Sequence, residues 1–303
     1  MPSIIIGTTP IHGTRMTNGL ALKTQPDIDA ALRQREEWLR QRKRPLRLKM
    51  PAMLYPVGIS RTYQATVRGY FDELAQLVND RIIARLPELL RQGQFELGIR
   101  TDTAEDDLRT EIEGIEVRFG EVVPASAIGA RAVDTATLVS GFNLKQNDKM
   151  IKQVLQVDPF RSEPWLRAQM QGFAKQNVTL IKSLEQTVLK DVETIVYRGW
   201  RQGLRDEEVS KEIRQKLKVS KSRADLIARD QINKLNGQLS RVRQQELGLL
   251  RYRWRTARDE RVRATHAARE GRVFSWDSPP ADGHPGEPIN CRCYAEPILE
   301  DLI

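Results

Sequence analysis

Cysteine and long apolar runs are the two features that this sequence most clearly lacks. The 303 residues include two cysteines, Cys291 and Cys293, and the single residue between them makes an intramolecular disulfide geometrically unfavourable. A scaffold held together by disulfides is therefore excluded, and the reducing cytoplasm suits this composition. No segment approaches the run of about eighteen apolar residues that a membrane span needs, so we expect no membrane association.

The N-terminal residues also lack the features of an export signal. A short apolar patch at Ile4 to Ile6 has no basic flank before it and no long apolar stretch after it, so we expect a protein made in the cytoplasm. Residues 1–26 are rich in Gly, Thr and Pro and show no lasting periodicity. We therefore predict an N-terminal arm whose order depends on packing against something else.

Charge is plentiful and unevenly placed. Charged residues make up 29% of the chain and the net charge is +9, with 21 Lys and Arg against 10 Asp and Glu between Arg198 and Arg272. The basic character therefore belongs to the second half of the chain. Such an excess favours an anionic partner, either nucleic acid or an acidic protein surface, while a solvated helix face is the plainer explanation.

Helical periodicity dominates residues 27–160, which we predict to form a helical body. Helices are expected from Asp27, from about Ser60 and after Thr103, and Pro87 should kink or end the second of these. The small residues between 120 and 141 favour close packing or loops and leave that stretch unassigned. The second helix has the clearest apolar face, which consists of Tyr63, Val67, Tyr70, Phe71, Leu74, Leu77 and Val78.

Residues 161–248 are predicted to form further long helices. The sequence Ser162-Glu163-Pro164 is a good helix start, and the helix should run toward Gly203. Asp206 should open a shorter helix and Ser220 another, which ends at Gly248.

After Gly248 the period changes to two, which predicts a small C-terminal module of helix and sheet over residues 249–303. Tyr252 and Trp254 alternate with arginines in a first strand, and 271–276 and 291–295 predict two more. A short helix is expected around Thr265 to Glu270. The fold class that follows is α+β, mostly α, with an elongated helical body.

One stretch of this module, Trp254 to Cys293, combines a Trp, an Asp-x-x-Val-Arg, a His on a short helix, a Gly-x-Val-Phe, a loop rich in Pro, Gly and His, and a closing Asn-Cys-Arg-Cys. In this combination it resembles the phage Mu-F-like minor head protein family. The preceding Ala228 to Arg241 is similar to the family's helix upstream of this stretch, and the resemblance covers roughly 190–297. Nothing in residues 1–189 resembles the family.

The resemblance implies a minor capsid protein of a tailed bacteriophage, located in the virion head. Its expected partners are the portal, the major capsid protein or both, and packaged double-stranded DNA is a further candidate. Related modules occur fused to toxin domains, but no such enzymatic region is evident in this sequence.

The two cysteines allow two interpretations. If both lie on one strand face, they could bind one metal ion, with His266 and His284 completing a tetrahedral zinc site. Structural zinc sites usually use Cys-x-x-Cys, however, and two small thiols on a strand face are ordinary core residues. We therefore expect no cofactor, with zinc as the alternative.

His266 invites a catalytic interpretation as well. With Asp259 and Arg263 it could form a polar cluster in which a carboxylate orients the imidazole, as a hydrolase needs. An Asp259–Arg263 pair that stabilises a helix is the plainer explanation, because no nucleophile motif or acidic metal pair stands beside it. We therefore expect no enzyme, and no residue is predicted to be catalytic.

The arginines of the module are the best candidates for binding a partner. They could bind phosphates along DNA or acidic residues of a portal or capsid protein. No aromatic residues alternate with them on the basic face, so any DNA contact should be independent of sequence. The predicted binding set is Arg251, Arg253, Arg255, Arg258, Arg261 and Arg263.

Three functions remain open, in order of preference. The first is a structural protein that bridges head components during assembly and genome packaging or ejection. The second is a sequence-independent DNA-binding accessory protein of the head. The third is a metal-dependent enzyme, which rests on His266, His284, Cys291 and Cys293 alone.

Overall fold

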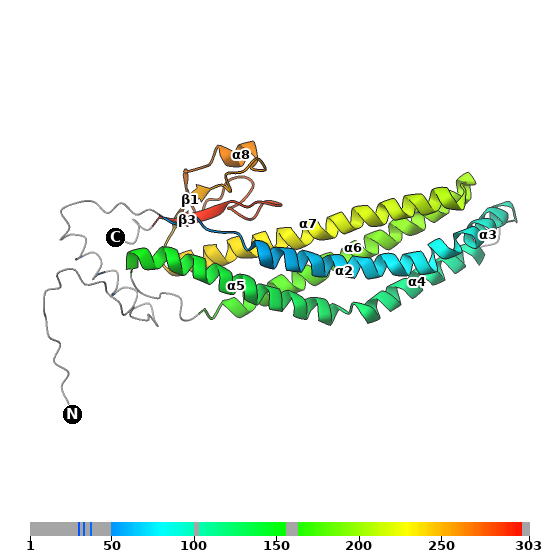
Figure 1. The fold of residues 1–303 in the computed structure, drawn as a ribbon, viewed down its shortest axis with the longest axis horizontal. Helices are drawn as coiled ribbons and strands as arrows, with labels where there is room; N and C mark the ends of the chain where they lie inside the picture. Colours follow the sequence, from blue (N-terminus) through cyan, green and yellow to red (C-terminus); the bar gives the residue numbers. More distant parts are fainter. Residues whose placement is uncertain are drawn as a thin grey trace, which may run out of the picture.

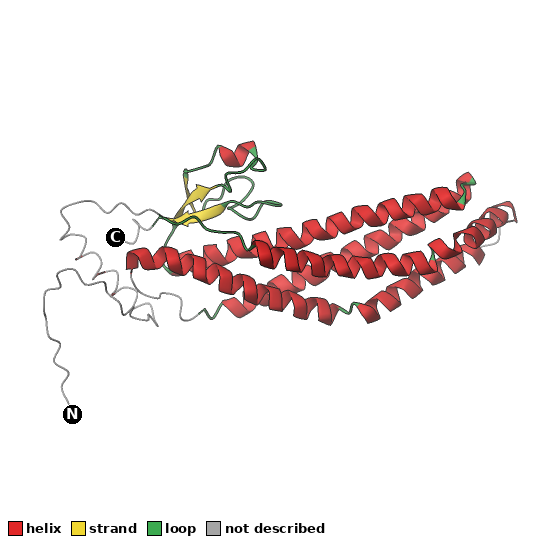
Figure 2. Ribbon diagram, in the orientation of Figure 1, coloured by secondary structure: helices red, strands yellow, loops and turns green. Residues whose placement is uncertain are grey.

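A computed structural model describes residues 50–99, 103–155 and 163–298, together with the helical positions Ala30, Arg33 and Glu37. It shows an elongated bundle of long helices with a small module of helix and sheet beside the last of them (Figure 1, Figure 2). The α+β, mostly α fold class is thereby confirmed. The predicted arm at 1–26 lies outside the described residues, as does most of the helix predicted from Asp27.

The bundle begins at α2 and ends with α7, and the chain then enters the sheet. In chain order the elements are α2 Val57–Arg81, the short 3-10 helix η1 Ile83–Arg85, α3 Leu86–Ile99, α4 Thr103–Val122, α5 Ala125–Leu155, α6 Leu166–Gln202, α7 Asp206–Glu246, β1 Arg251–Arg255, α8 Ala264–Ala267, β2 Val273–Ser275 and β3 Tyr294–Pro297.

Apolar residues spaced three and four apart hold the bundle together. On α2 the side chains of Tyr63, Val67, Phe71, Leu74 and Val78 are all buried, as their periodicity predicts. They belong to a hydrophobic core that also includes residues of α3 to α7. The predicted stretches 27–160 and 161–248 thus share one core.

Helix α7 differs from the prediction, because one continuous helix replaces the two that were expected. It begins at Asp206 as predicted, and the Glu208 carboxylate accepts a hydrogen bond from the Arg205 backbone N–H at 3.1 Å. Ser220 lies inside the helix, where its hydroxyl donates to the Lys216 carbonyl at 2.9 Å. A serine can make this bond within a helix, so without a nearby Gly or Pro it does not start a new one.

The sheet is antiparallel, with strand order β2-β1-β3. Tyr252 and Trp254 of β1 are buried, as the alternation predicts, and they lie opposite Phe274 and Ala295. The third strand was expected to start at Cys291 but begins at Tyr294, because Tyr294 pairs with Arg255, the last residue of β1. The two cysteines therefore precede the strand.

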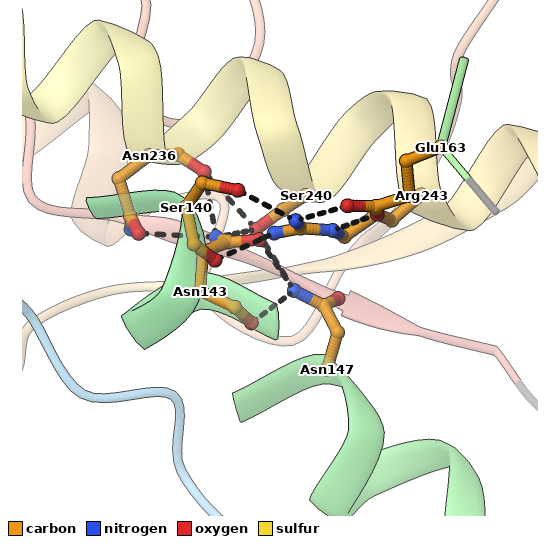
Figure 3. Close-up of polar contacts among 7 residues, drawn as sticks. All are labelled: Ser140, Asn143, Asn147, Glu163, Asn236, Ser240 and Arg243. Carbon is orange, nitrogen blue, oxygen red and sulfur yellow. Dashed lines mark hydrogen bonds and ion pairs between the residues drawn. The ribbon is translucent and has the colours of Figure 1, made fainter. Parts of the chain in front are cut away.

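A buried polar cluster joins α5, α7 and the segment that leads into α6 (Figure 3). The guanidinium of Arg243, which is 0% exposed, donates to both Glu163 carboxylate oxygens at 2.6 and 2.8 Å. It also donates to the Ser140 hydroxyl and to the Asn143 side-chain oxygen at 2.9 and 2.6 Å. The arginine therefore fixes the relative position of three chain segments by its hydrogen bonds.

The C-terminal module docks directly on the backbone of α7. At Gly237 an added Cβ would lie 2.8 Å from the Pro285 carbonyl oxygen, so the helix and the loop approach closely. The Asn290 backbone N–H donates to Asp230 at 2.8 Å, and Gln244 donates to the Ala295 carbonyl at 3.0 Å. These contacts hold the module on the C-terminal half of α7, which includes the stretch Ala228 to Arg241 that resembles the family helix.

Substitution of Gly237 by alanine tests this docking. Alanine normally stabilises a helix by about 1 kcal/mol relative to glycine, but here it must displace the Pro285 carbonyl, and overpacking costs about 1–3 kcal/mol. We expect a net loss of stability in thermal melts. Gly172→Ala on α6 is the matched control, because nothing lies within 4 Å of its added Cβ. Equal stabilisation by both alanines would show that the loop does not pack on Gly237.

No single helix in the described ranges is long and apolar enough to cross a membrane. Two consecutive helical segments, Ala104–Val122 and Ala125–Lys152, are together long and apolar enough, but the chain bends by 44° between them.

A basic pocket beside a cysteine and histidine cluster

A pocket of about 590 Å³ lies between α2, α7 and the C-terminal module. Its lining contains no Asp or Glu, whereas five arginines from four chain segments contribute to it. We call it the basic pocket; its arginines are Arg61, Arg229, Arg261, Arg263 and Arg292. A pocket with this lining attracts anions, because no carboxylate neutralises the arginines from within it.

The module and α7 hold three of these arginines in place. Arg229 donates to the Asn290 side-chain oxygen at 3.0 Å, Arg292 to Asp259 at 2.8 Å and Arg263 to the Ile289 carbonyl at 2.6 Å. The side chains of Arg61 and Arg261 are exposed and make no hydrogen bond or ion pair with the part of the chain described here. These two are free to meet a ligand.

The predicted arginine set divides between two places. Arg261 and Arg263 line the basic pocket, whereas Arg253, Arg255 and Arg258 form ion pairs inside the module. Arg251 is exposed at the start of β1. The structure therefore brings only part of the set together at one surface.

Two glutamates account for the arginines that pair internally. Arg255 donates through Nε and Nη2 to the two oxygens of Glu296, at 2.9 and 3.0 Å, and through Nη1 to Glu270. Burial alone would raise the pKa of Glu270, but hydrogen bonds from Thr256, Arg258 and Arg255 outweigh it and lower that pKa. These pairs hold β1, β3 and the turn after α8 together.

At the floor of the pocket lies a cluster of His266, Cys291 and Cys293, all three buried. The His266 Nδ1 atom is 3.6 Å from the Cys291 Sγ and 3.5 Å from the Cys293 Sγ. α8 carries the histidine, and the cysteines follow Asn290, whose φ of 57° turns the chain just before them. The convergence thus comes from this turn, and not from the strand face that the sequence suggested.

His284, the fourth ligand that the sequence suggested, lies apart from this cluster. Its Nδ1 is 3.0 Å from the Tyr252 hydroxyl, and its ring packs against Trp276. Burial lowers its pKa and favours the neutral imidazole. The described residues that could hold one metal ion together are His266, Cys291 and Cys293, without His284.

Asp282 is the carboxylate partner of His266, in place of the Asp259 that the sequence suggested. Its Oδ2 is 3.0 Å from the His266 Nε2, while its Oδ1 accepts a hydrogen bond from Arg269. Burial raises the pKa of Asp282, but the hydrogen bonds from Arg269 and His266 outweigh this effect and lower it. An ionised Asp282 can only accept, so the His266 Nε2 atom donates in this hydrogen bond and the Nδ1 atom faces the two cysteines.

The two thiols are not equivalent. A hydrogen bond from Cys293, aided by the Gly286 backbone N–H at 3.4 Å, lowers the pKa of Cys291 to about 6. Donating that bond and burial both raise the pKa of Cys293. Cys291 is therefore the more acidic thiol of the pair.

The fold and the pocket define a class of protein: a long helical body that carries a small module with a basic pocket. Among known families, residues 190–296 match the one described as Phage Mu protein F like protein. The resemblance seen in the sequence is thereby confirmed for this C-terminal part of the chain.

A relative from Haemophilus influenzae, described as an uncharacterized protein, is 36% identical over 142 residues. The match covers 46% of this chain and 32% of the relative, so the chain spans about a third of the relative's length. No solved structure matches the chain significantly.

Proposed function

We propose that this chain is a minor head protein of a tailed bacteriophage that bridges head components during assembly and genome packaging or ejection. The observation that carries the proposal is the Mu-F-like match over residues 190–296, the segment that holds four of the pocket's five arginines. We propose a structural role in the virion head with the portal, the major capsid protein or both as partners, and no catalysis.

The shape of the molecule suits a bridging role. The bundle is elongated, and the module with its basic pocket lies beside the C-terminal half of α7, away from the tip formed by α3 (Figure 1). One molecule therefore has two separated surfaces. The basic pocket is the surface that we propose docks on acidic side chains of a partner, because its arginines come from elements that the fold already holds together.

Charge reversal in the basic pocket tests this proposal. Arg61→Glu, Arg261→Glu and Arg263→Glu combined should reduce binding to the portal or major capsid protein more than about tenfold, because like charges at an interface cost several kcal/mol. The measurement is the amount of chain recovered per assembled head when it is produced with those proteins. Its melting temperature should fall only slightly, because all three side chains are exposed and the only hydrogen bond that the described residues lose is the one from Arg263 to the Ile289 carbonyl.

The matched control reverses three exposed arginines of the bundle, Arg109, Arg118 and Arg131, which lie on α4 and α5. This control should enter heads at the wild-type level. If the pocket variant is incorporated as well as this control, the basic pocket has no protein partner in the head.

Packaged double-stranded DNA is the second candidate, and the absence of any carboxylate from the pocket lining favours it. Binding through phosphates would be independent of sequence and would weaken steeply as salt rises. Mobility shifts of purified chain with two unrelated duplexes, at low and physiological salt, separate the candidates. Salt-sensitive binding that the triple reversal abolishes, together with normal incorporation into heads, would favour DNA over protein.

A further inference from the structure

Three potential ligand atoms meet at the floor of the basic pocket. They are His266 Nδ1, Cys291 Sγ and Cys293 Sγ, which all lie within 4.8 Å of one another. Each side chain is at most 8% exposed, so water competes little for the space between them. Thiolates and imidazoles are typical zinc ligands, whereas magnesium and calcium bind oxygen ligands.

The distances agree with those of a tetrahedral zinc centre. With Zn–S near 2.3 Å and Zn–N near 2.0–2.1 Å, tetrahedral angles place sulfur and nitrogen about 3.6 Å apart. The two observed separations from His266 Nδ1 are 3.6 and 3.5 Å. The sulfur–nitrogen separations are therefore those that one shared zinc ion would require.

Hydrogen bonding alone accounts poorly for this arrangement. Because Nε2 contacts Asp282, Nδ1 is the ring nitrogen left for the cysteines, and a single ring nitrogen makes one good hydrogen bond. Two sulfurs nevertheless lie at almost the same distance from it. A cation between the three atoms would bind the nitrogen and both thiolates at once.

The surroundings resemble the outer shell of a metal site. A histidine that binds a metal usually donates its other ring N–H to a carboxylate, which Asp282 provides at 3.0 Å. The Gly286 backbone N–H donates to the Cys291 sulfur, and Arg269 holds Asp282 in turn.

We propose that His266, Cys291 and Cys293 bind one zinc ion, with Asp282 as the positioning residue for the histidine. All three ligands line the basic pocket, so water or an anion from that pocket takes the fourth position. The ion would join α8 to the segment that leads into β3. Neither of these segments is part of the sheet, so strand pairing does not hold them together. Zinc binding therefore contributes directly to the folding of the module.

Metal analysis of the wild-type chain, purified without a polyhistidine tag, is the first test. After dialysis against zinc-free buffer the protein should retain about one zinc ion per chain, and a strong chelator should remove it and lower the melting temperature. Addition of zinc chloride should restore the melting temperature. Reconstitution with cobalt chloride should give the absorption of tetrahedral Co²⁺ with a charge-transfer band from thiolate, which reports the two sulfur ligands.

Variants then assign the ligands. Cys291→Ser and Cys293→Ser should each lose the cobalt thiolate band in part and bind zinc far more weakly. Asp282→Asn should retain the fold and weaken zinc binding about 10- to 100-fold. Asp277→Asn is the matched control, since Asp277 is exposed in the same loop and lies outside the cluster.

Wild-type protein that retains no zinc after loading with zinc chloride, and that melts identically with and without chelator, would overturn the proposal. The same follows if Asp282→Asn and Asp277→Asn bind zinc equally well. Neither result bears on incorporation into heads, so the proposed function stands or falls separately.

Discussion

Replacing Arg243 by methionine is expected to lower the free energy of unfolding by about 3–5 kcal/mol, because it leaves a buried carboxylate without its partner. The Glu163 side chain is 10% exposed and that of Arg243 is 0% exposed. Denaturant unfolding followed by circular dichroism measures the change. Arg214→Met is the control on the same helix; it is exposed and should shift stability by less than about 0.5 kcal/mol.

The size of this effect follows from how completely the guanidinium is used. Nε, Nη1 and Nη2 of Arg243 all donate, to Glu163, Ser140 and Asn143 (Figure 3). Lysine offers no planar fork, so Arg243→Lys should also destabilise the protein although it keeps the charge.

A double substitution separates the charge from the packing. When Glu163→Met is added to Arg243→Met, the unpaired carboxylate disappears, so the double variant should be more stable than the Arg243→Met single variant. If the single variant loses less than about 1 kcal/mol, water reaches the cluster and the carboxylate is not buried in solution.

The helices were predictable wherever apolar side chains keep a regular spacing. The start at Asp206 and the end at Gly203 were predicted correctly, because a local hydrogen bond from the Arg205 backbone N–H to Glu208 and a left-handed glycine determine them. The helix start predicted at Ser162 to Pro164 was wrong by a few residues, as α6 begins at Leu166. Glu163 is instead held by Arg243, a contact over 80 residues that no local pattern reveals.

The candidate site was predictable in part. The sequence predicted no cofactor and offered a zinc site of His266, His284, Cys291 and Cys293 as the alternative; the structure brings His266 and the two cysteines together but not His284. Asp282 was missed because it lies 16 residues from His266 in an irregular loop, where spacing carries no information. Three arginines of the basic pocket were also missed: Arg292, which lies between the two cysteines, and Arg61 and Arg229, which the fold brings from α2 and α7 to the module.

Replacing Trp254 by alanine is expected to cost about 3–5 kcal/mol in the stability of the C-terminal module, as truncation of a buried aromatic usually does. Trp254 is 0% exposed, and its ring contacts those of Phe274 and His266 with centroids 5.9 and 5.2 Å apart. The Arg269 guanidinium lies 4.9 Å from the same ring. Hydrogen exchange should show the loss in residues 251–297 before the bundle opens.

A comparison of Trp254→Ala with Cys293→Ala separates apolar packing from metal binding. In chelator, Cys293→Ala removes one small buried side chain and should cost less than Trp254→Ala, because the tryptophan buries far more apolar surface. In excess zinc the stability difference between Cys293→Ala and the wild type should be larger than in chelator, because the variant lacks the zinc-binding free energy that also stabilises the fold. A cysteine variant whose deficit relative to the wild type is the same in both conditions would assign Cys293 to the apolar core alone.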